Sequence, residues 1–149
     1  MWAPWPLPTS SSARSRWPFA SFCAVSLHGI GIDVADVRRI ARLIERHGGR
    51  FTQRWFVPEE VAQCDVCEFP TLSFAVRFAA KEAVWKSLGV KWDGPVPWRS
   101  IMILHAETAP IVELLGDVAD AARALGVLKI SVAASVRDHR AFAVAIAEL

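Results

Sequence analysis

The spacing of apolar residues changes along the chain, and each change predicts a switch between helix and strand. From 37 to 46 apolar residues recur every third or fourth position, which is the pattern of one helical face. The pair Gly48-Gly49 is expected to end this helix. A longer helix is predicted over 71–88, a segment with no proline or glycine before Gly89. These two segments are the clearest helices in the sequence.

Strands are predicted where short apolar runs alternate with polar or small residues. These runs cover 25–32, 100–105, 111–115, 130–136 and 142–146. A short helix is expected to begin at Pro58, and another amphipathic helix to cover 118–125. The resulting order, β-α-α-α-β-β-α-β-β, favours an α+β domain with an antiparallel sheet packed on the long helix.

The first 26 residues differ from the rest of the chain because they contain no Asp or Glu. They are rich in proline and tryptophan instead (Pro4, Pro6, Pro8, Pro18, Trp2, Trp5, Trp17). Prolines at this density prevent a helix, and Pro18 and Ser21 interrupt the stretch that a secretory signal would need. We expect 1–26 to be a disordered extension or a start placed too far upstream, and 27–149 to be a single domain.

Composition narrows the class of protein. Hydrophobic residues make up 53% of the chain and the mean hydropathy is +0.29, which excludes a disordered chain. No apolar run is long enough for a membrane span, and a net charge of +2 argues against nucleic-acid binding. Three cysteines are too few for a disulfide scaffold, so a cytoplasmic location is expected. The high apolar fraction indicates buried subunit contacts.

An acidic residue follows closely spaced glycines in the segment Gly29-Ile30-Gly31-Ile32-Asp33. Glycines at the end of a strand allow another backbone to approach closely. Asp33 by itself is most simply interpreted as the cap of the following helix. The other interpretation is a functional carboxylate at the end of the first strand.

The long predicted helix carries a second candidate motif. Phe78, Glu82 and Lys86 are spaced four residues apart and therefore project from one side, with Lys81 next to them. A solvated Glu-Lys pair would explain this pattern. The alternative is a metal-ligating carboxylate between two lysines that neutralise phosphate.

Together these segments resemble a known family. Gly31-Ile32-Asp33 and Phe78-x-x-Lys81-Glu82-x-x-x-Lys86 are similar to the two signature motifs of the phosphopantetheinyl transferases, in particular the short holo-acyl-carrier-protein synthase type. The segment 51–60 resembles the family's linking segment, and the resemblance extends over about 27–148. It implies the 4'-phosphopantetheinyl transferase fold and a homotrimer whose active sites are shared between subunits.

The resemblance also implies an activity. Family members transfer the phosphopantetheine arm of coenzyme A to a serine of an apo carrier protein and release adenosine 3',5'-bisphosphate. Asp33 and Glu82 match the family's Mg²⁺ ligands, and Asp33, Glu82 and Lys86 would be the catalytic residues. The residues expected to contact coenzyme A are Arg77, Phe78, Lys81, Lys86, Gly89 and Arg137.

A basic ridge on the first helix is the expected contact for the carrier protein. It consists of Arg38, Arg39, Arg42 and Arg46. Carrier proteins of the fatty-acid, polyketide and peptide-synthetase types are acidic around their serine, so complementary charge would steer the encounter. A solvated helix face is the alternative interpretation.

Some positions depart from the family pattern. Gly89-Val90-Lys91 replaces a common Gly-Thr-Gly, Arg137 replaces a small hydroxyl residue, and Val57 replaces a threonine cap. These departures suggest a member specialised for a polyketide or peptide-synthetase carrier. They also leave open a non-catalytic relative that binds coenzyme A or a carrier protein. The lone Cys64-x-x-Cys67 motif lacks the further ligands of a zinc site, so zinc and redox roles are disfavoured.

Overall fold

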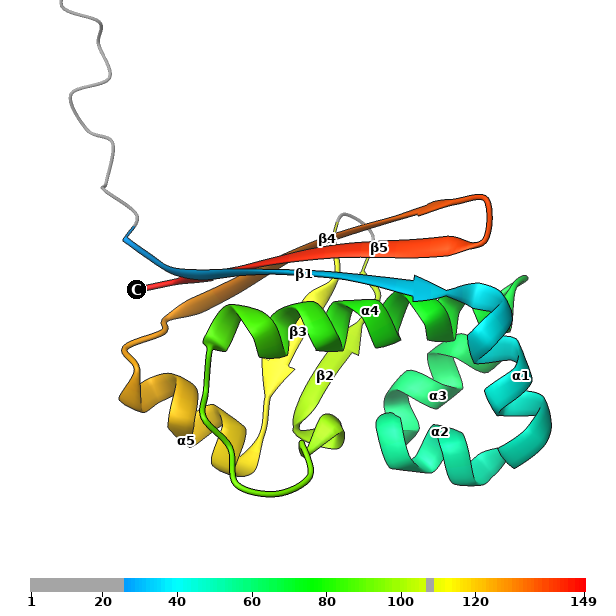
Figure 1. Cartoon of the computed structure of the whole chain (residues 1–149), viewed down its shortest axis with the longest axis horizontal. Helices are drawn as coiled ribbons and strands as arrows, with labels where there is room; N and C mark the ends of the chain where they lie inside the picture. Colours follow the sequence, from blue (N-terminus) through cyan, green and yellow to red (C-terminus); the bar gives the residue numbers. More distant parts are fainter. Residues whose placement is uncertain (1–25, 107–108) are drawn as a thin grey trace, which may run out of the picture.

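A computed structural model describes residues 26–106 and 109–149 (Figure 1). Its elements are β1 (Leu27–Asp36), α1 (Val37–His47), α2 (Gly49–Trp55), α3 (Pro58–Asp65), α4 (Pro70–Leu88), η1 (Trp98–Ser100), β2 (Ile101–Leu104), β3 (Ile111–Leu114), α5 (Gly116–Ala124), β4 (Lys129–Arg137) and β5 (Arg140–Glu148). The extension expected over 1–26 lies outside the described residues, except for Ser26. None of the described helices is long and apolar enough to cross a membrane.

The strands form two antiparallel sheets. β1, β5 and β4 make a three-stranded sheet in that order, and β2 pairs with β3 in a separate hairpin. The long helix α4 runs along the three-stranded sheet, with the β2–β3 hairpin and helices α1 to α3 on its other sides (Figure 1). The prediction of an α+β fold with an antiparallel sheet on a long helix is therefore confirmed.

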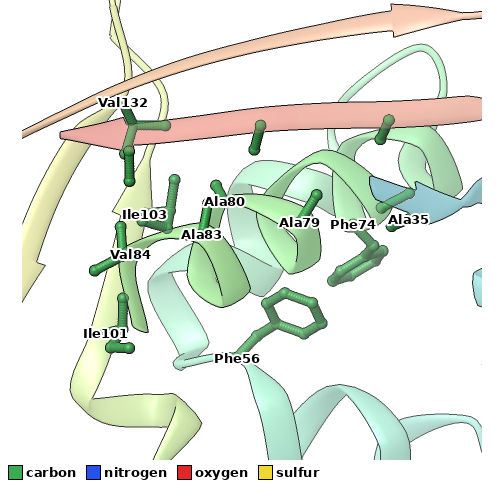
Figure 2. Packing of buried hydrophobic residues seen from close by; sticks show 14 of the residues in the cluster. Ala35, Phe56, Phe74, Ala79, Ala80, Ala83, Val84, Ile101, Ile103 and Val132 are labelled. Carbon is green, nitrogen blue, oxygen red and sulfur yellow. The ribbon is translucent and has the colours of Figure 1, made fainter. Parts of the chain in front are cut away.

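Small residues let this sheet approach α4 closely. On β5 the buried face is a row of alanines (Ala141, Ala143, Ala145, Ala147), and α4 presents Ala75, Ala79 and Ala83. Figure 2 shows Ala79 and Ala83 beneath the sheet. On β1 a Cβ added to Gly31 would lie 1.9 Å from the carbonyl oxygen of Ala83, so only glycine fits there. The backbone of β1 thus lies directly against α4.

The opposite face of the same sheet carries the large apolar side chains. Ile30, Ile32 and Val34 of β1 pair with Ile146, Val144 and Phe142 of β5. Their exposed fractions range from 36% to 60% in the single chain. This apolar sheet face, made of these six residues, is continuous across two strands.

Two local features differ from the sequence predictions. The segment after Gly48 is a helix, α2, which was not predicted, so four α-helices rather than three lie between β1 and β2. Only Gly48, with φ 52°, interrupts the helical conformation, and Gly49 already begins the next helix. The first strand also continues beyond Ile32 to Asp36, because β5 pairs with it along that length.

Candidate active site

Asp33 and Lys86 meet where β1 crosses the C-terminal half of α4. Lys86 Nζ lies 2.7 Å from Asp33 Oδ1 and also donates to the Ile32 carbonyl at 3.2 Å. The Lys86 side chain is 49% exposed and that of Asp33 17%. Asp33 does not cap α1, because Asp36 accepts hydrogen bonds from the first turn instead. The capping interpretation of Asp33 is therefore wrong.

Glu82 lies one turn before Lys86 and completes a cluster of three charges. Burial raises the pKa of the Glu82 carboxyl, and the Asp33 charge raises it further, while Lys86 lowers it. The Lys86 ammonium pairs with Asp33 and acts on Glu82 only as a nearby charge, so the Asp33–Glu82–Lys86 cluster has two carboxylates for one ammonium group. Such a cluster favours binding of a cation. Within 26–106 and 109–149, no group of three His, Cys, Asp or Glu side chains is placed to hold a metal ion.

Lys81 lies away from this cluster, although it precedes Glu82 in sequence. Its ammonium group is fully buried and pairs with Glu60 Oε2 at 2.7 Å. It also donates to the carbonyls of Trp98 and Ile101. Burial lowers the pKa of Lys81, and the Glu60 carboxylate opposes this effect. The expectation that Lys81 contacts phosphate beside Glu82 therefore has no support in this geometry.

Arg77 is also buried, with 5% of its surface exposed. Its Nε donates to the Ile103 carbonyl at 3.1 Å, and its Nη2 donates to Gln63 Oε1 at 2.7 Å. It lines a groove of about 530 Å³ together with Leu72 and Val76. Because Arg77 and Glu82 are five residues apart, they point about 140° apart around the helix axis. Arg77 and Glu82 therefore lie on different sides of α4, and the contact of Arg77 with coenzyme A stays a prediction.

The remaining expected coenzyme A contacts occupy three different places. Phe78 packs on Trp55, with ring centroids 4.3 Å apart. Gly89 ends α4 in the left-handed conformation, with φ 61°. Arg137 is exposed at the β4–β5 turn, and its register partner is Arg140, three residues from the partner of Asp33. Gly89 therefore lies one turn beyond the cluster, whereas Arg137 lies on an outer strand away from it.

The expected carrier ridge is exposed, and it borders a groove that the sequence did not reveal. Arg38, Arg39, Arg42 and Arg46 are all exposed. Of these four, Arg39 lines a groove of about 550 Å³ between α1 and α2, together with Arg50 and Arg54. Apolar side chains from α1 and α2 form much of its wall (Ile40, Leu43, Phe51, Trp55). Arg50 and Arg54 were missed because α2 was missed, although their four-residue spacing is a helical signal.

Comparisons with known proteins agree with the fold and with the motifs. The family model for the 4'-phosphopantetheinyl transferase superfamily matches residues 29–147. A holo-[acyl-carrier-protein] synthase from Burkholderia lata is 37% identical over 126 residues, covering 80% of this chain and 87% of that protein. One from Methylobacterium radiotolerans is 44% identical over 93 residues, covering 62% and 68%.

Solved structures of the same kind are also similar. The holo-[acyl-carrier-protein] synthase of Neisseria meningitidis has a TM-score of 0.75 at 31% identity, covering 83% of this chain and 99% of that one. The Helicobacter pylori enzyme in complex with coenzyme A has a TM-score of 0.68 at 27% identity, covering 79% and 98%. The chain therefore belongs to the 4'-phosphopantetheinyl transferase superfamily, as the two sequence motifs predicted.

Proposed function

We propose that this protein transfers the 4'-phosphopantetheine arm of coenzyme A to a serine of an apo acyl carrier protein. Adenosine 3',5'-bisphosphate would be the other product. The observation that carries the proposal is the convergence of Asp33, Glu82 and Lys86 from β1 and α4 in one partly exposed cluster. The names of the similar proteins, and the coenzyme A bound to the Helicobacter pylori enzyme, support the same reaction.

The donor set of the cluster fits Mg²⁺. Asp33 and Glu82 supply hard carboxylate oxygens, and Mg²⁺ is typically held by one or two carboxylates, waters and substrate phosphates. When bound, Mg²⁺ would neutralise charge that develops on the phosphates during transfer. The Asp33 charge adds to burial in raising the pKa of the Glu82 carboxyl, so ionised Glu82 carries a cost that a cation beside the two carboxylates would relieve.

Lys86 and Glu82 would perform the steps that the protein itself supplies. The half-exposed Lys86 ammonium, which pairs with Asp33 here, would stabilise the departing phosphate of adenosine 3',5'-bisphosphate. Burial and Asp33 raise the pKa of the Glu82 carboxyl when no cation is bound, and a bound cation would oppose this rise. We propose that Glu82 takes the proton of the carrier serine through a water molecule. The serine oxygen then forms its bond to phosphorus as the anhydride bond breaks.

The α1–α2 groove is the proposed docking site for the carrier. Its apolar wall and its arginines would suit a helix that carries both acidic and apolar side chains. Arg54→Glu, in the groove, is expected to raise the KM for the carrier more than Arg38→Glu, which lies on the ridge outside the groove. Both variants should leave the KM for coenzyme A unchanged. A larger effect of Arg38→Glu would favour the ridge alone.

A homotrimer with shared active sites is also proposed. The apolar sheet face would be covered in such an assembly, and its six large side chains are a feature that isolated domains rarely expose. In an active site formed by two subunits, Arg77 of one subunit would contact coenzyme A bound at the Asp33–Glu82–Lys86 cluster of the next subunit. Sedimentation should give a trimer for the wild type and smaller species for Ile32→Asp. A monomeric wild type at micromolar concentration would contradict this arrangement.

Carrier preference and location follow as finer proposals. The Val90-Lys91 and Arg137 departures support a carrier from a polyketide or peptide synthetase. Equal kcat/KM on a fatty-acid carrier would overturn this preference. A cytoplasmic location is supported by Cys64 and Cys67, both of which are free thiols.

Intact-mass spectrometry of an apo carrier protein tests the proposed reaction. After incubation with the protein, coenzyme A and Mg²⁺, the carrier should gain the mass of one phosphopantetheine. A chelator or Glu82→Gln should abolish the gain, while the circular dichroism of Glu82→Gln stays unchanged. No gain on fatty-acid, polyketide and peptide-synthetase carriers, with folded protein, would favour a non-catalytic relative.

A further inference from the structure

The buried pair Glu60–Lys81 connects three elements that surround α4. Lys81 belongs to α4 and Glu60 to α3, and their charged atoms lie 2.7 Å apart. The same ammonium group donates to the carbonyls of Trp98 in η1 and Ile101 at the start of β2. One side chain of α4 is therefore fixed simultaneously to a helix and to the β2–β3 hairpin.

No donor of Lys81 remains for a substrate. An ammonium group has three N–H donors, and here each has an acceptor inside the protein. Glu60 is equally satisfied, because it accepts from the backbone N–H groups of Val57 and Ile103, both at 2.9 Å. Both side chains are fully buried. Contact between Lys81 and a phosphate would require this whole network to break.

The position of Lys81 next to Glu82 gives the network a consequence for the site. Glu82 follows Lys81 directly, so a rotation or slide of α4 that breaks the Lys81 contacts also moves the Glu82 carboxylate. On another side of the helix, β1 contacts the carbonyl of Ala83 through Gly31. The helix is thus held by β1 on one side and by the Glu60–Lys81 pair on another, with Glu82 between these contacts in sequence.

We propose that Lys81 is a positioning residue, which acts with Glu60 to hold α4, and with it Glu82 and Lys86, at the distance from Asp33 of β1 that phosphopantetheine transfer requires. This inference rests on the proposed function of the cluster. It assigns Lys81 a different role from the phosphate contact that its place in the motif suggested. It also adds Glu60, the last residue of the 51–60 segment, to which no role was assigned, to the residues that determine turnover.

Steady-state kinetics of a double-mutant cycle tests this role. The variants are Lys81→Met, Glu60→Gln and the double variant, assayed well below the melting temperature of the least stable one. Each single change should lower kcat at least tenfold, with the KM and calorimetric Kd for coenzyme A within about threefold of wild type. The double variant should be no slower than the slower single variant, because the two residues act as a unit.

Two controls separate positioning from other effects. Val84→Ala removes buried volume from the same helix and keeps both charged side chains, and it should lower stability while leaving kcat unchanged. Lys86→Met should weaken coenzyme A binding, which Lys81→Met should not. The proposal is overturned if Lys81→Met weakens coenzyme A binding tenfold while Glu60→Gln does not, or if Val84→Ala slows turnover equally. If Lys81→Met does not fold, Glu60→Gln alone decides: an unchanged kcat overturns the proposal.

Hydrogen exchange distinguishes failure of this inference from failure of the proposed function. A wild type that transfers nothing to any carrier would overturn the proposed function only. In that case Lys81→Met and Glu60→Gln should still speed amide exchange over residues 98–104 and at Val57. Unchanged exchange at these amides would show that the pair does not hold α4 against the hairpin, and would overturn the positioning role independently.

Discussion

Helix α4 carries two charged clusters that differ in almost every physical respect. The Glu60–Lys81 pair is fully buried, and each of its polar atoms has a partner. The Asp33–Glu82–Lys86 cluster is partly exposed and has one ammonium group for two carboxylates. Lys81 and Glu82 are neighbours in sequence, yet a 100° step around the helix places them in these opposite environments.

The difference between the clusters predicts different contributions to stability. A buried charge must be paired, because an unpaired one would cost several kcal/mol. A partly exposed cluster can remain incompletely neutralised at a smaller cost. The buried, paired arrangement holds the helix in place. The partly exposed cluster keeps an unfavourable electrostatic energy, which the binding of a cation and a substrate would lower. Variants of the two clusters should therefore differ most in their effect on the free energy of unfolding.

The largest expected contrast is in the stability of Lys81→Met and Lys86→Met. Lys81→Met leaves the buried Glu60 carboxylate without its cationic partner and should lower the free energy of unfolding by about 3–5 kcal/mol. Lys86→Met removes a partner that is half exposed and should change it by about 1 kcal/mol or less. Urea unfolding of both variants measures the difference. Equal losses would mean that the two clusters are not distinct in the way the structure indicates.

A second contrast concerns the contact that brings β1 to α4. Gly31→Ala places a Cβ 1.9 Å from the Ala83 carbonyl oxygen, so the strand must move away. Overpacking of this kind costs about 1–3 kcal/mol, and moving Asp33 should also reduce turnover. Gly49→Ala is the matched control, since its Cβ would meet only Gln53 at 3.6 Å. Thermal melts and carrier labelling should change for the first variant alone; a wild-type rate for Gly31→Ala would contradict the proposed dependence on β1.

The smallest expected effect is a gain of stability on neutralising Glu82. Because burial and Asp33 raise the pKa of Glu82 in the folded state, the ionised carboxylate costs stability above that pKa. Glu82→Gln without Mg²⁺ should therefore melt slightly higher than wild type at pH 7. The difference should shrink as the pH falls through the raised pKa, and vanish below the unfolded value of about 4.3. A variant less stable at pH 7 than at pH 4, relative to wild type, would reverse the sign.

The sequence predicted α4 and the strands well because their signals are local. An uninterrupted segment ends at a glycine, and strands alternate with period two. The burial of the Lys81 side chain depends instead on the carbonyls of Trp98 and Ile101, about twenty residues away in sequence. No local pattern specifies these contacts. The capping residue of α1 was misplaced because β5 extends β1 by a few residues, so Asp36 rather than Asp33 precedes the helix.

Helix α2 illustrates a different limit. Two adjacent glycines normally indicate the end of a helix followed by a loop. Here only Gly48 has the left-handed φ that interrupts the helical conformation. Phe51 then anchors the new helix by burial against Phe56, with ring centroids 6.3 Å apart. The groove that α2 forms with α1 was consequently not predicted from the sequence, although Arg39 of the predicted ridge lines it.

The most direct test of the account is a crystal structure with coenzyme A and Mn²⁺, a Mg²⁺ substitute with anomalous scattering. We expect one Mn²⁺ peak bound by Asp33 and Glu82, phosphate oxygens within reach of Lys86, and Lys81 still paired with Glu60. A metal bound elsewhere, or Lys81 turned out to contact phosphate, would contradict the division of α4 into a reactive and a structural side.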